Sequence, residues 1–201
     1  MKLYLMRHCE AVKHPLLRYT LDSLTDNGVQ EARDISKKFN RKLDYLVSSP
    51  SLRALRTAEI IANERNMKVI TNPNWMELSR GIYADRPYEE FLEVWSKGNY
   101  DYDYIPPQGE SVNQGRRRIV KGVEDILNLD GDVLCTTHAG LISNLLMMLF
   151  SFNFEEGKPK VGCFCELWFD GNYFILMPEL NRFLNIKEVI LSPKTKLDKF
   201  K

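Results

Sequence analysis

Reactive side chains gather at the start of the chain, in the sequence MKLYLMRHCE. The apolar run from Lys2 to Met6 is typical of a buried first strand, and it is too short for a secretory leader or a membrane span. Arg7, His8 and Cys9 follow it, where a strand gives way to a loop. Ligands of open α/β sheets bind beyond the carboxyl ends of the strands, so this cluster predicts a site. We expect His8 to be a nucleophile and Arg7 to hold the group that it attacks.

Three further segments place a charged or polar side chain beside a predicted strand end or helix start. They contain Arg53, near the start of a helix opened by Ser49-Pro50, Glu77, beyond the third strand, and His138, just after the strand that ends at Thr136. In a parallel sheet these strand ends meet at one edge, where two arginines, two histidines and a helix N-terminus converge. Guanidinium groups match phosphate oxygens, and the free N–H groups of a helix start favour negative charge. The pattern therefore predicts an anion site.

The elements that must position these residues alternate between strands and helices. Strands are predicted at about residues 2–6, 43–47, 68–71 and 132–136, with a hairpin at 163–178. Helices are predicted at about 25–39, 50–64, 88–97, 111–127 and 139–150. Thr25 is the expected cap of the first helix, and Pro50 the first residue of the second. This alternation predicts an α/β three-layer sandwich, with a mainly parallel central sheet and helices on both faces.

Residues 72–108 interrupt the alternation with a run of aromatic side chains. These are Trp75, Tyr83, Tyr88, Phe91, Trp95, Tyr100, Tyr102 and Tyr104. We interpret the segment as an inserted, aromatic-rich lid within a single domain of residues 1–201. Its rings are expected to pack mainly on one another, and the alternative is a platform for a substrate. The lysine-rich tail after Pro193 is expected to fray.

Composition limits the class of protein. The 44% of hydrophobic residues allow a sizeable core, and a net charge of +1 argues against a general nucleic-acid binder while leaving room for a positive pocket. No stretch is long enough to span a bilayer. The four cysteines lack the spacing of a zinc site, so we expect reduced thiols in a cytoplasmic protein.

Six short motifs resemble those of the histidine phosphatases, the superfamily that includes cofactor-dependent phosphoglycerate mutase. In chain order they are LMRHCE, LTDNGVQEA, SSPSLRALRTAEII, MELSRGIYADRPYEEF, PQGESV and LCTTHAGLISNLL. They run from Leu3 to about Leu146 and so cover most of the chain. Each motif is weak evidence alone, but six in the family's order are specific.

The resemblance implies that His8 becomes transiently phosphorylated on a ring nitrogen. Arg7, Arg53 and His138 would bind the phosphoryl oxygens, and Glu77 would donate a proton to the leaving alcohol. The implied activity is a phosphatase acting on a small-molecule phosphomonoester, without a metal ion or other cofactor. We expect a monomer or homodimer with no nucleic-acid or membrane partner.

These roles set requirements on protonation. His8 must be neutral to attack, whereas a protonated His138 would help to hold an oxyanion, so we expect the two imidazoles to titrate differently. Glu77 must carry a proton when it donates, so we expect a partly desolvated position. Glu110 either orients groups of the site or is a carboxylate that the helix dipole favours.

Three positions depart from the family's pattern. Cys9 replaces the usual glycine after the nucleophile, and because cysteine is small we expect activity to be retained. His14 stands where relatives often have an asparagine that contacts phosphate, and it can donate the same hydrogen bond. Ala139 stands where many relatives have glycine, and only its backbone N–H would be needed.

Cys9 also raises two hypotheses of its own. Cysteine phosphatases use a thiolate with an arginine six residues later, but the residue at that position is Pro15, so this mechanism fails. The second hypothesis is that Cys9 makes the protein oxidisable, because a thiol beside two arginines has a lowered pKa.

Four further arginines are expected to lie outside the site. Arg56 is expected to form a salt bridge, and Arg116, Arg117 and Arg118 a solvated helix face, with attraction of an anionic substrate as the alternative.

A phosphatase is favoured over a phosphoglycerate mutase-type transferase, because a mutase needs enclosing segments that shield its phosphoenzyme from water. The other alternative is a catalytically weak regulatory or binding member.

Overall fold

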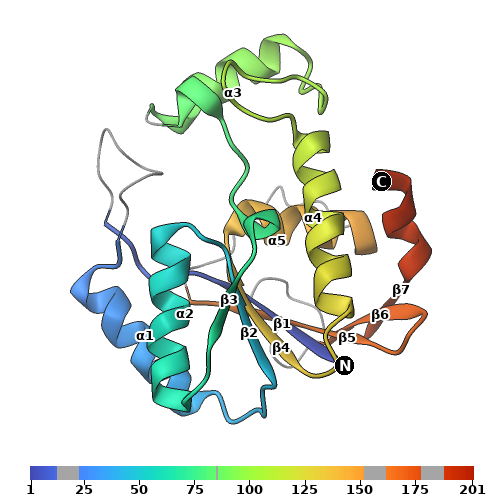
Figure 1. Ribbon diagram of the computed structural model, residues 1–201. Helices are drawn as coiled ribbons and strands as arrows, with labels where there is room; N and C mark the ends of the chain where they lie inside the picture. Colours follow the sequence, from blue (N-terminus) through green and yellow to red (C-terminus); the bar gives the residue numbers. More distant parts are fainter. Residues whose placement is uncertain (13–22, 85, 152–161, 178–187) are drawn as a thin grey trace.

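In a computed structural model, residues 1–12, 23–84, 86–151, 162–177 and 188–201 are described. They form a seven-stranded sheet with helices on both faces (Figure 1). The strands are β1 (Lys2–Arg7), β2 (Tyr45–Ser48), β3 (Val69–Thr71), β4 (Val133–Thr137), β5 (Phe164–Phe169), β6 (Tyr173–Met177) and β7 (Ile190–Pro193). The α-helices are α1 (Asp26–Lys38), α2 (Leu52–Arg65), α3 (Tyr88–Lys97), α4 (Val112–Leu127) and α5 (Ala139–Phe150). The predicted α/β three-layer sandwich is confirmed.

The sheet has a parallel half and an antiparallel half. Its order is β3-β2-β4-β1-β5-β6-β7; the first four strands pair in parallel, and β5, β6 and β7 pair antiparallel. The predicted hairpin is formed by β5 and β6. Strand β7 was not predicted, because it is an edge strand of 4 residues that ends at Pro193, and a proline argues against a strand in the sequence.

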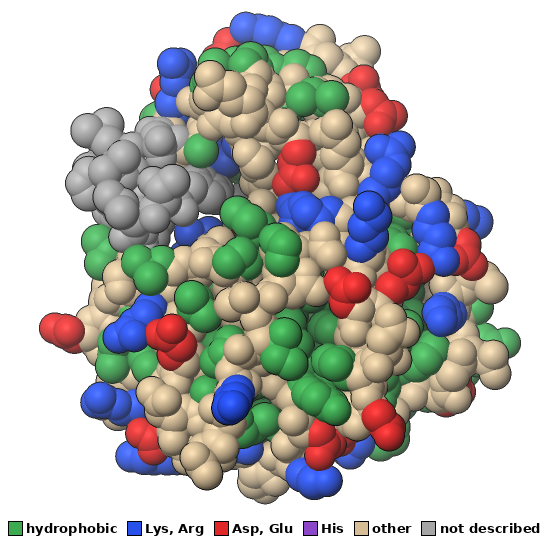
Figure 2. Space-filling view, in the orientation of Figure 1, with side chains coloured by type: hydrophobic (Ala, Val, Ile, Leu, Met, Phe, Trp, Pro, Cys, Tyr) green, Lys and Arg blue, Asp and Glu red, His purple; other side chains and the backbone are tan. Residues whose placement is uncertain are grey.

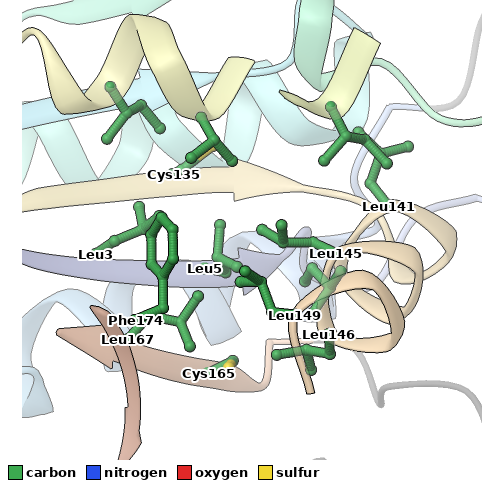
Figure 3. Packing of buried hydrophobic residues seen from close by; sticks show 14 of the residues in the cluster. Leu3, Leu5, Cys135, Leu141, Leu145, Leu146, Leu149, Cys165, Leu167 and Phe174 are labelled. Carbon is green, nitrogen blue, oxygen red and sulfur yellow. The ribbon is translucent and has the colours of Figure 1, made fainter. Parts of the chain in front are cut away.

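Alternate residues of the strands enter two separate hydrophobic cores. Leu3 and Leu5 of β1 join a cluster that includes residues of α4 and α5, whereas Tyr4 and Met6 join a cluster with residues of α1 and α2. Figure 3 shows Leu145 and other leucines of α5 directed toward the sheet residues of the first cluster. Because successive side chains of a strand point to opposite faces, a strand buried on both sides reads as a continuous apolar run.

Helix caps largely follow the sequence, with one correction. The side chain of Thr25 accepts a hydrogen bond from Gly28 N–H and so caps α1, as predicted. Helix α2 begins at Leu52, with Ser51 at the N-cap position but without a capping hydrogen bond from its side chain, so the prediction that Pro50 is its first residue is wrong. Ser and proline favour several positions around a helix start, and the pattern alone does not separate Ser49 from Ser51.

The aromatic segment contains the 3₁₀-helices η1 (Pro73–Trp75) and η2 (Gly81–Tyr83), followed by α3. Helix α3 has no buried residue and lies apart from the sheet (Figure 1). The ring centroids of Phe91 and Trp95 are 5.9 Å apart, and those of Trp95 and Tyr102 are also 5.9 Å apart, both pairs stacked. The rings therefore pack on one another, as expected, and a role of this segment as a lid stays a prediction.

The chain end is ordered, which corrects the expectation that it frays. Residues Lys194–Phe200 form the 3₁₀-helix η3, which lies beside α4 (Figure 1). Leu197 is buried in the core, and Lys196 Nζ donates a hydrogen bond to Leu149 O at 2.9 Å. The sequence did not predict this ordered end, because the segment is rich in lysine and Leu197 is a single leucine among them.

The surface mixes charges of both signs. Figure 2 shows the Lys and Arg side chains interspersed with Asp and Glu over the visible face, as the net charge of +1 implies. Among the described residues, no helix combines the length and the apolar character needed to cross a bilayer.

Candidate active site

The two described histidines follow neighbouring parallel strands. Strands β1 and β4 pair in a register that sets Arg7 opposite Thr137, so His8 and His138 are the next residue on each strand. The backbone N–H of His8 donates to Thr137 O at 2.9 Å, and the two imidazole centroids are 5.4 Å apart. The sheet thus brings together two residues that are 130 positions apart in the sequence.

Arg53 bridges the two imidazoles from the first turn of α2. Its Nε–H donates to His8 Nε2 at 3.1 Å, and its Nη2 donates to His138 Nδ1, also at 3.1 Å. Arg53 is only 6% exposed, although it is a cation. Arg56, one turn further along α2, is exposed and pairs with Glu59 at 2.8 Å, as predicted.

These hydrogen bonds define the tautomers of both rings. His8 Nδ1 lies 2.8 Å from Cys9 O, which can only accept, so Nδ1 carries the proton and Nε2 keeps its lone pair. A guanidinium can only donate, so His138 Nδ1 is the acceptor and its proton lies on Nε2. That proton is directed to Ser49 Oγ at 3.0 Å.

Both imidazoles are held neutral in the free protein. Burial, and next the charge of Arg53, lower the pKa of His8 to about 3, and the same two causes lower the pKa of His138 well below its usual range. The expectation of a neutral His8 agrees with this result. The expectation of a protonated His138 is wrong for the free protein, because a proton there would lie buried beside two arginines.

The depressed pKa of His8 has a consequence for stability. Between about pH 6.5 and pH 3 the unfolded chain protonates His8 and the folded chain does not, so acid favours unfolding. We expect wild type to lose about 1 kcal/mol of unfolding free energy relative to His8→Asn between about pH 7 and pH 5.5. Urea unfolding of both proteins at the two pH values measures this. If the difference in unfolding free energy between the two proteins is the same at both pH values, the buried, neutral state of His8 is contradicted.

Arg7 and Glu77 lie within electrostatic range of each other at this end of the sheet. Burial lowers the pKa of Arg7, and the carboxylate of Glu77 is the main opposing influence. Glu77 is half-buried, as expected, and its Oε2 accepts a hydrogen bond from Gly140 N–H at 3.3 Å. Gly140 lies in the first turn of α5, so the carboxylate meets the N-terminal end of the helix that follows His138.

The approach of Glu77 to α5 requires the absence of a side chain at Gly140. A Cβ there would lie 2.5 Å from Glu77 Oε1. We expect Gly140→Ala to displace the carboxylate and to reduce kcat by about 10-fold or more, which is part of the roughly 10²–10⁴-fold that a general acid contributes. Assays of phosphomonoester hydrolysis, with Ala139→Gly as the neighbouring control, check this. Unchanged activity in Gly140→Ala would show that this position of the carboxylate is not required.

Glu110 contacts the segment that carries Glu77. Its Oε1 accepts from Ser79 N–H at 3.0 Å, and its carboxylate pairs with Arg118. The prediction that Arg116 and Arg118 belong to a solvated face is wrong. Arg116 is 8% exposed and stacks over Tyr102, whereas Arg117 alone of the three is exposed.

Cys9 is fully buried, and burial raises the pKa of its thiol to about 12. The hypothesis of a reactive, low-pKa thiol is therefore wrong, because desolvation disfavours the thiolate. Its backbone does not adopt a positive φ, so a side chain at this position meets no conformational penalty. Ala139 is the first residue of α5, where a backbone N–H has no acceptor within the helix. His14 lies outside the described residues.

Two contributors were missed in the sequence. Ser49 was predicted only as a helix cap. It nevertheless directly follows a buried strand, as both histidines of the site do. Arg118 was hidden among three consecutive arginines, and no pattern in the sequence separated it from Arg116 and Arg117. Within the described part of the chain, no three His, Cys, Asp or Glu side chains form a group that could hold a metal ion.

Comparison with known proteins agrees with this geometry. A family model described as the histidine phosphatase superfamily (branch 1) matches residues 3–176. The relative named "Probable phosphoglycerate mutase GpmB" from Yersinia pestis (strain Pestoides F) is 28% identical over 138 residues, which are 64% of this chain. The match also spans 64% of the length of that curated relative.

Solved structures share the fold. A mutant of phosphoserine phosphatase from Entamoeba histolytica, in complex with phosphoserine, is similar with a TM-score of 0.73 at 21% identity, covering 91% of this chain and 99% of that chain. The alpha-ribazole phosphatase from Shigella flexneri gives 0.72 at 19% identity, covering 94% and 100%. With the family model matching most of its length, the chain belongs to branch 1 of the histidine phosphatase superfamily.

Proposed function

We propose that this protein is a phosphatase that hydrolyses a small-molecule phosphomonoester through a phosphohistidine at His8. The observation that carries the proposal is the state of His8. Its Nδ1 is bound to Cys9 O, its pKa is lowered to about 3, and its Nε2 lone pair faces the fork of Arg53. A neutral imidazole aimed at an arginine fork is suited to attack a group that the same arginine holds.

In the first step, His8 Nε2 bonds to phosphorus and the bond from phosphorus to the ester oxygen breaks. The phosphoryl oxygens replace the imidazole nitrogens as acceptors for Arg53, and Arg7 and His138 contribute further donors. A phosphate dianion beside His138 favours its protonated form, which differs from the free protein. Glu77 gives its proton to the leaving alcohol oxygen.

In the second step, water attacks the phosphorus of phospho-His8. The carboxylate of Glu77 takes the proton of the water, the bond between nitrogen and phosphorus breaks, and inorganic phosphate leaves. His8 and Glu77 return to their starting states, so the cycle needs no metal ion or other cofactor. We propose a monomer or homodimer without nucleic-acid or membrane partners, with residues 72–108 as a lid.

A second candidate is phosphoryl transfer of the phosphoglycerate mutase type. The name of the Yersinia relative favours it, whereas the related structures named above are of phosphatases. A third candidate is a catalytically weak regulatory member, against which the presence of Arg7, His8, Arg53, Glu77 and His138 together argues.

A panel of phosphomonoesters, scored by free phosphate in the presence of EDTA, tests the proposal. The panel contains phosphoserine, alpha-ribazole phosphate, a sugar phosphate and 3-phosphoglycerate. The phosphatase predicts free phosphate from at least one of them. Movement of phosphate between positions of phosphoglycerate with little release would favour the mutase, and no turnover of any compound would favour the regulatory member.

A further inference from the structure

We infer that Arg118 is a positioning residue that holds the backbone of the Glu77 segment, and through it the carboxyl group that protonates the leaving group. The inference rests on the proposed function. Glu77 needs such support because it lies between η1 and η2, in backbone without helix or strand hydrogen bonds. A general acid must stay within hydrogen-bond reach of the leaving oxygen, which irregular backbone alone does not ensure.

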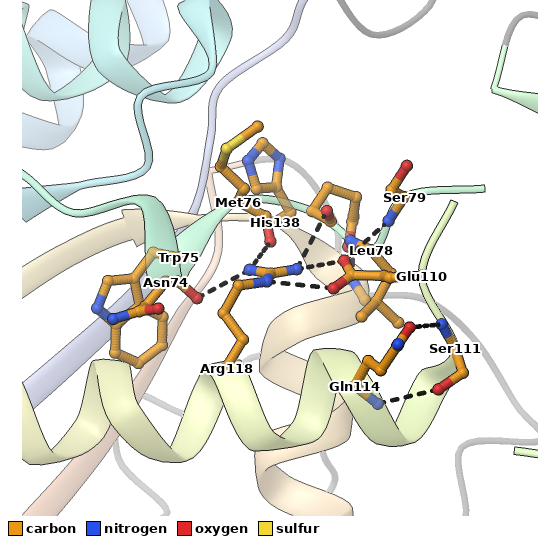
Figure 4. A network of polar contacts seen from close by, with 12 residues as sticks. Asn74, Trp75, Met76, Leu78, Ser79, Glu110, Ser111, Gln114, Arg118 and His138 are labelled. Atoms are coloured by element: carbon orange, nitrogen blue, oxygen red, sulfur yellow. Dashed lines mark hydrogen bonds and ion pairs between the residues drawn. The ribbon is translucent and has the colours of Figure 1, made fainter. Parts of the chain in front are cut away.

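Arg118 binds three backbone carbonyl groups of this segment. Its Nη1 donates to Asn74 O at 2.9 Å and to Met76 O at 2.7 Å, and its Nη2 donates to Glu77 O at 3.5 Å (Figure 4). These are carbonyl groups of the main chain, so the contacts fix backbone position and do not depend on neighbouring side chains. A planar guanidinium with several donors suits this task, and a lysine ammonium does not reproduce its geometry.

Glu110 holds Arg118 and extends the clamp past Glu77. Its Oε2 accepts from Arg118 Nε at 3.3 Å, and its Oε1 accepts from Arg118 Nη2 and from Ser79 N–H. The backbone N–H of Glu110 in turn donates to Ser79 O at 3.0 Å. The Arg118–Glu110 pair therefore contacts the backbone of Met76 and of Ser79, before and after Glu77 in the chain (Figure 4).

Packing holds the same segment against α4. A Cβ at Gly122 would lie 3.0 Å from the Trp75 ring, and one at Gly115 would lie 2.0 Å from Leu78 Cδ2. Trp75 is fully buried, and its carbonyl accepts from Thr137 Oγ1 at 2.8 Å, directly before His138. Helix α4, which carries Arg118, therefore packs closely against the Glu77 segment. That segment in turn contacts the strand that carries His138.

This role predicts a loss that depends on the leaving group. Phenyl phosphate releases a phenol with a pKa of about 10, so its ester oxygen needs a proton. The dinitrophenolate released by 2,4-dinitrophenyl phosphate is stable as an anion and needs none. A variant that misplaces Glu77 therefore has a lowered kcat/KM for phenyl phosphate and a much less lowered kcat/KM for 2,4-dinitrophenyl phosphate.

The experiment measures kcat/KM of both substrates for Arg118→Met, Arg118→Lys and Glu110→Gln. Arg117→Met is the matched control, because Arg117 is the exposed neighbour on the same helix. We expect Arg118→Met to lose about 10²-fold with phenyl phosphate, the lower end of a general acid's contribution, and about 3-fold or less with the dinitrophenyl ester. Arg118→Lys retains the charge without the fork and is expected to resemble Arg118→Met, and Glu110→Gln to show a smaller loss with the same selectivity.

Equal losses with both substrates in the near-isosteric Glu110→Gln, or no loss in Arg118→Met, would overturn the inference. Full activity in Arg118→Lys would also overturn it, since it would show that charge alone suffices. The proposed function is judged separately, by whether wild type hydrolyses the dinitrophenyl ester and His8→Ala does not. Failure of the Arg118 inference therefore leaves that result intact.

Discussion

Replacing His8 with alanine is expected to reduce phosphomonoester hydrolysis by about 10⁴-fold or more, because no other group takes over the covalent step. The Nε2 lone pair that faces Arg53 disappears with the ring. The fold is expected to remain, because the imidazole that is removed is neutral, with a pKa lowered to about 3, and Arg53 keeps its hydrogen bond to His138 although it loses the one to His8. Release of phosphate under single-turnover conditions measures the effect.

Cys9→Ala is the matched control for this loss. Cys9 is the adjacent residue and is equally buried, and burial raises the pKa of its thiol to about 12, so it is not a competing nucleophile. We expect Cys9→Ala to keep most of the activity that His8→Ala loses. Comparable losses in the two variants would contradict the assignment of His8 as the nucleophile.

Arg53→Met is expected to lower kcat by about 10²–10³-fold, or about 3–4 kcal/mol in the barrier, by analogy with the loss of an oxyanion donor. Arg53 supplies two of its donors to the two imidazoles, at 3.1 Å each, and in the proposed mechanism these donors hold the phosphoryl oxygens. Arg53→Lys keeps the charge but loses the fork, so only partial recovery is expected.

Arg56→Met provides the comparison within α2. Arg56 is exposed and pairs with Glu59, and such surface pairs contribute about 0–1 kcal/mol to stability. We expect its kcat to be unchanged in the same assay. A larger loss in Arg56→Met than in Arg53→Met would reverse the assignment of the two arginines.

Patterns with a strong physical cause were readable from the sequence. A strand buried on both faces must be apolar throughout, which located β1 and β4 and, with them, the positions of His8 and His138. Thr25 was recognisable because a hydroxyl at a helix start satisfies a free N–H group. The convergence of both histidines with Arg53 then followed from the parallel order of the strands.

Features that depend on tertiary contacts were not readable. The protonation of His138 depends on its complete burial beside Arg53, which residue type does not reveal. Arg118 and Arg117 are adjacent and chemically identical, and only the docking of α4 against the Glu77 segment separates the half-buried Arg118, bound to backbone carbonyls, from the exposed Arg117. The ordered tail similarly depends on the packing of Leu197 into the core, beside α4 and α5.

Detection of the phosphoenzyme is the sharpest test of covalent catalysis by His8. The protein is mixed with a radiolabelled phosphomonoester that it hydrolyses, and the reaction is quenched in alkali within the first turnover. We expect covalent label that is stable in base, labile in acid and located on the peptide containing His8, and that is absent from His8→Ala. Active wild-type protein without such label, or with label on another residue, would exclude a phosphohistidine at His8.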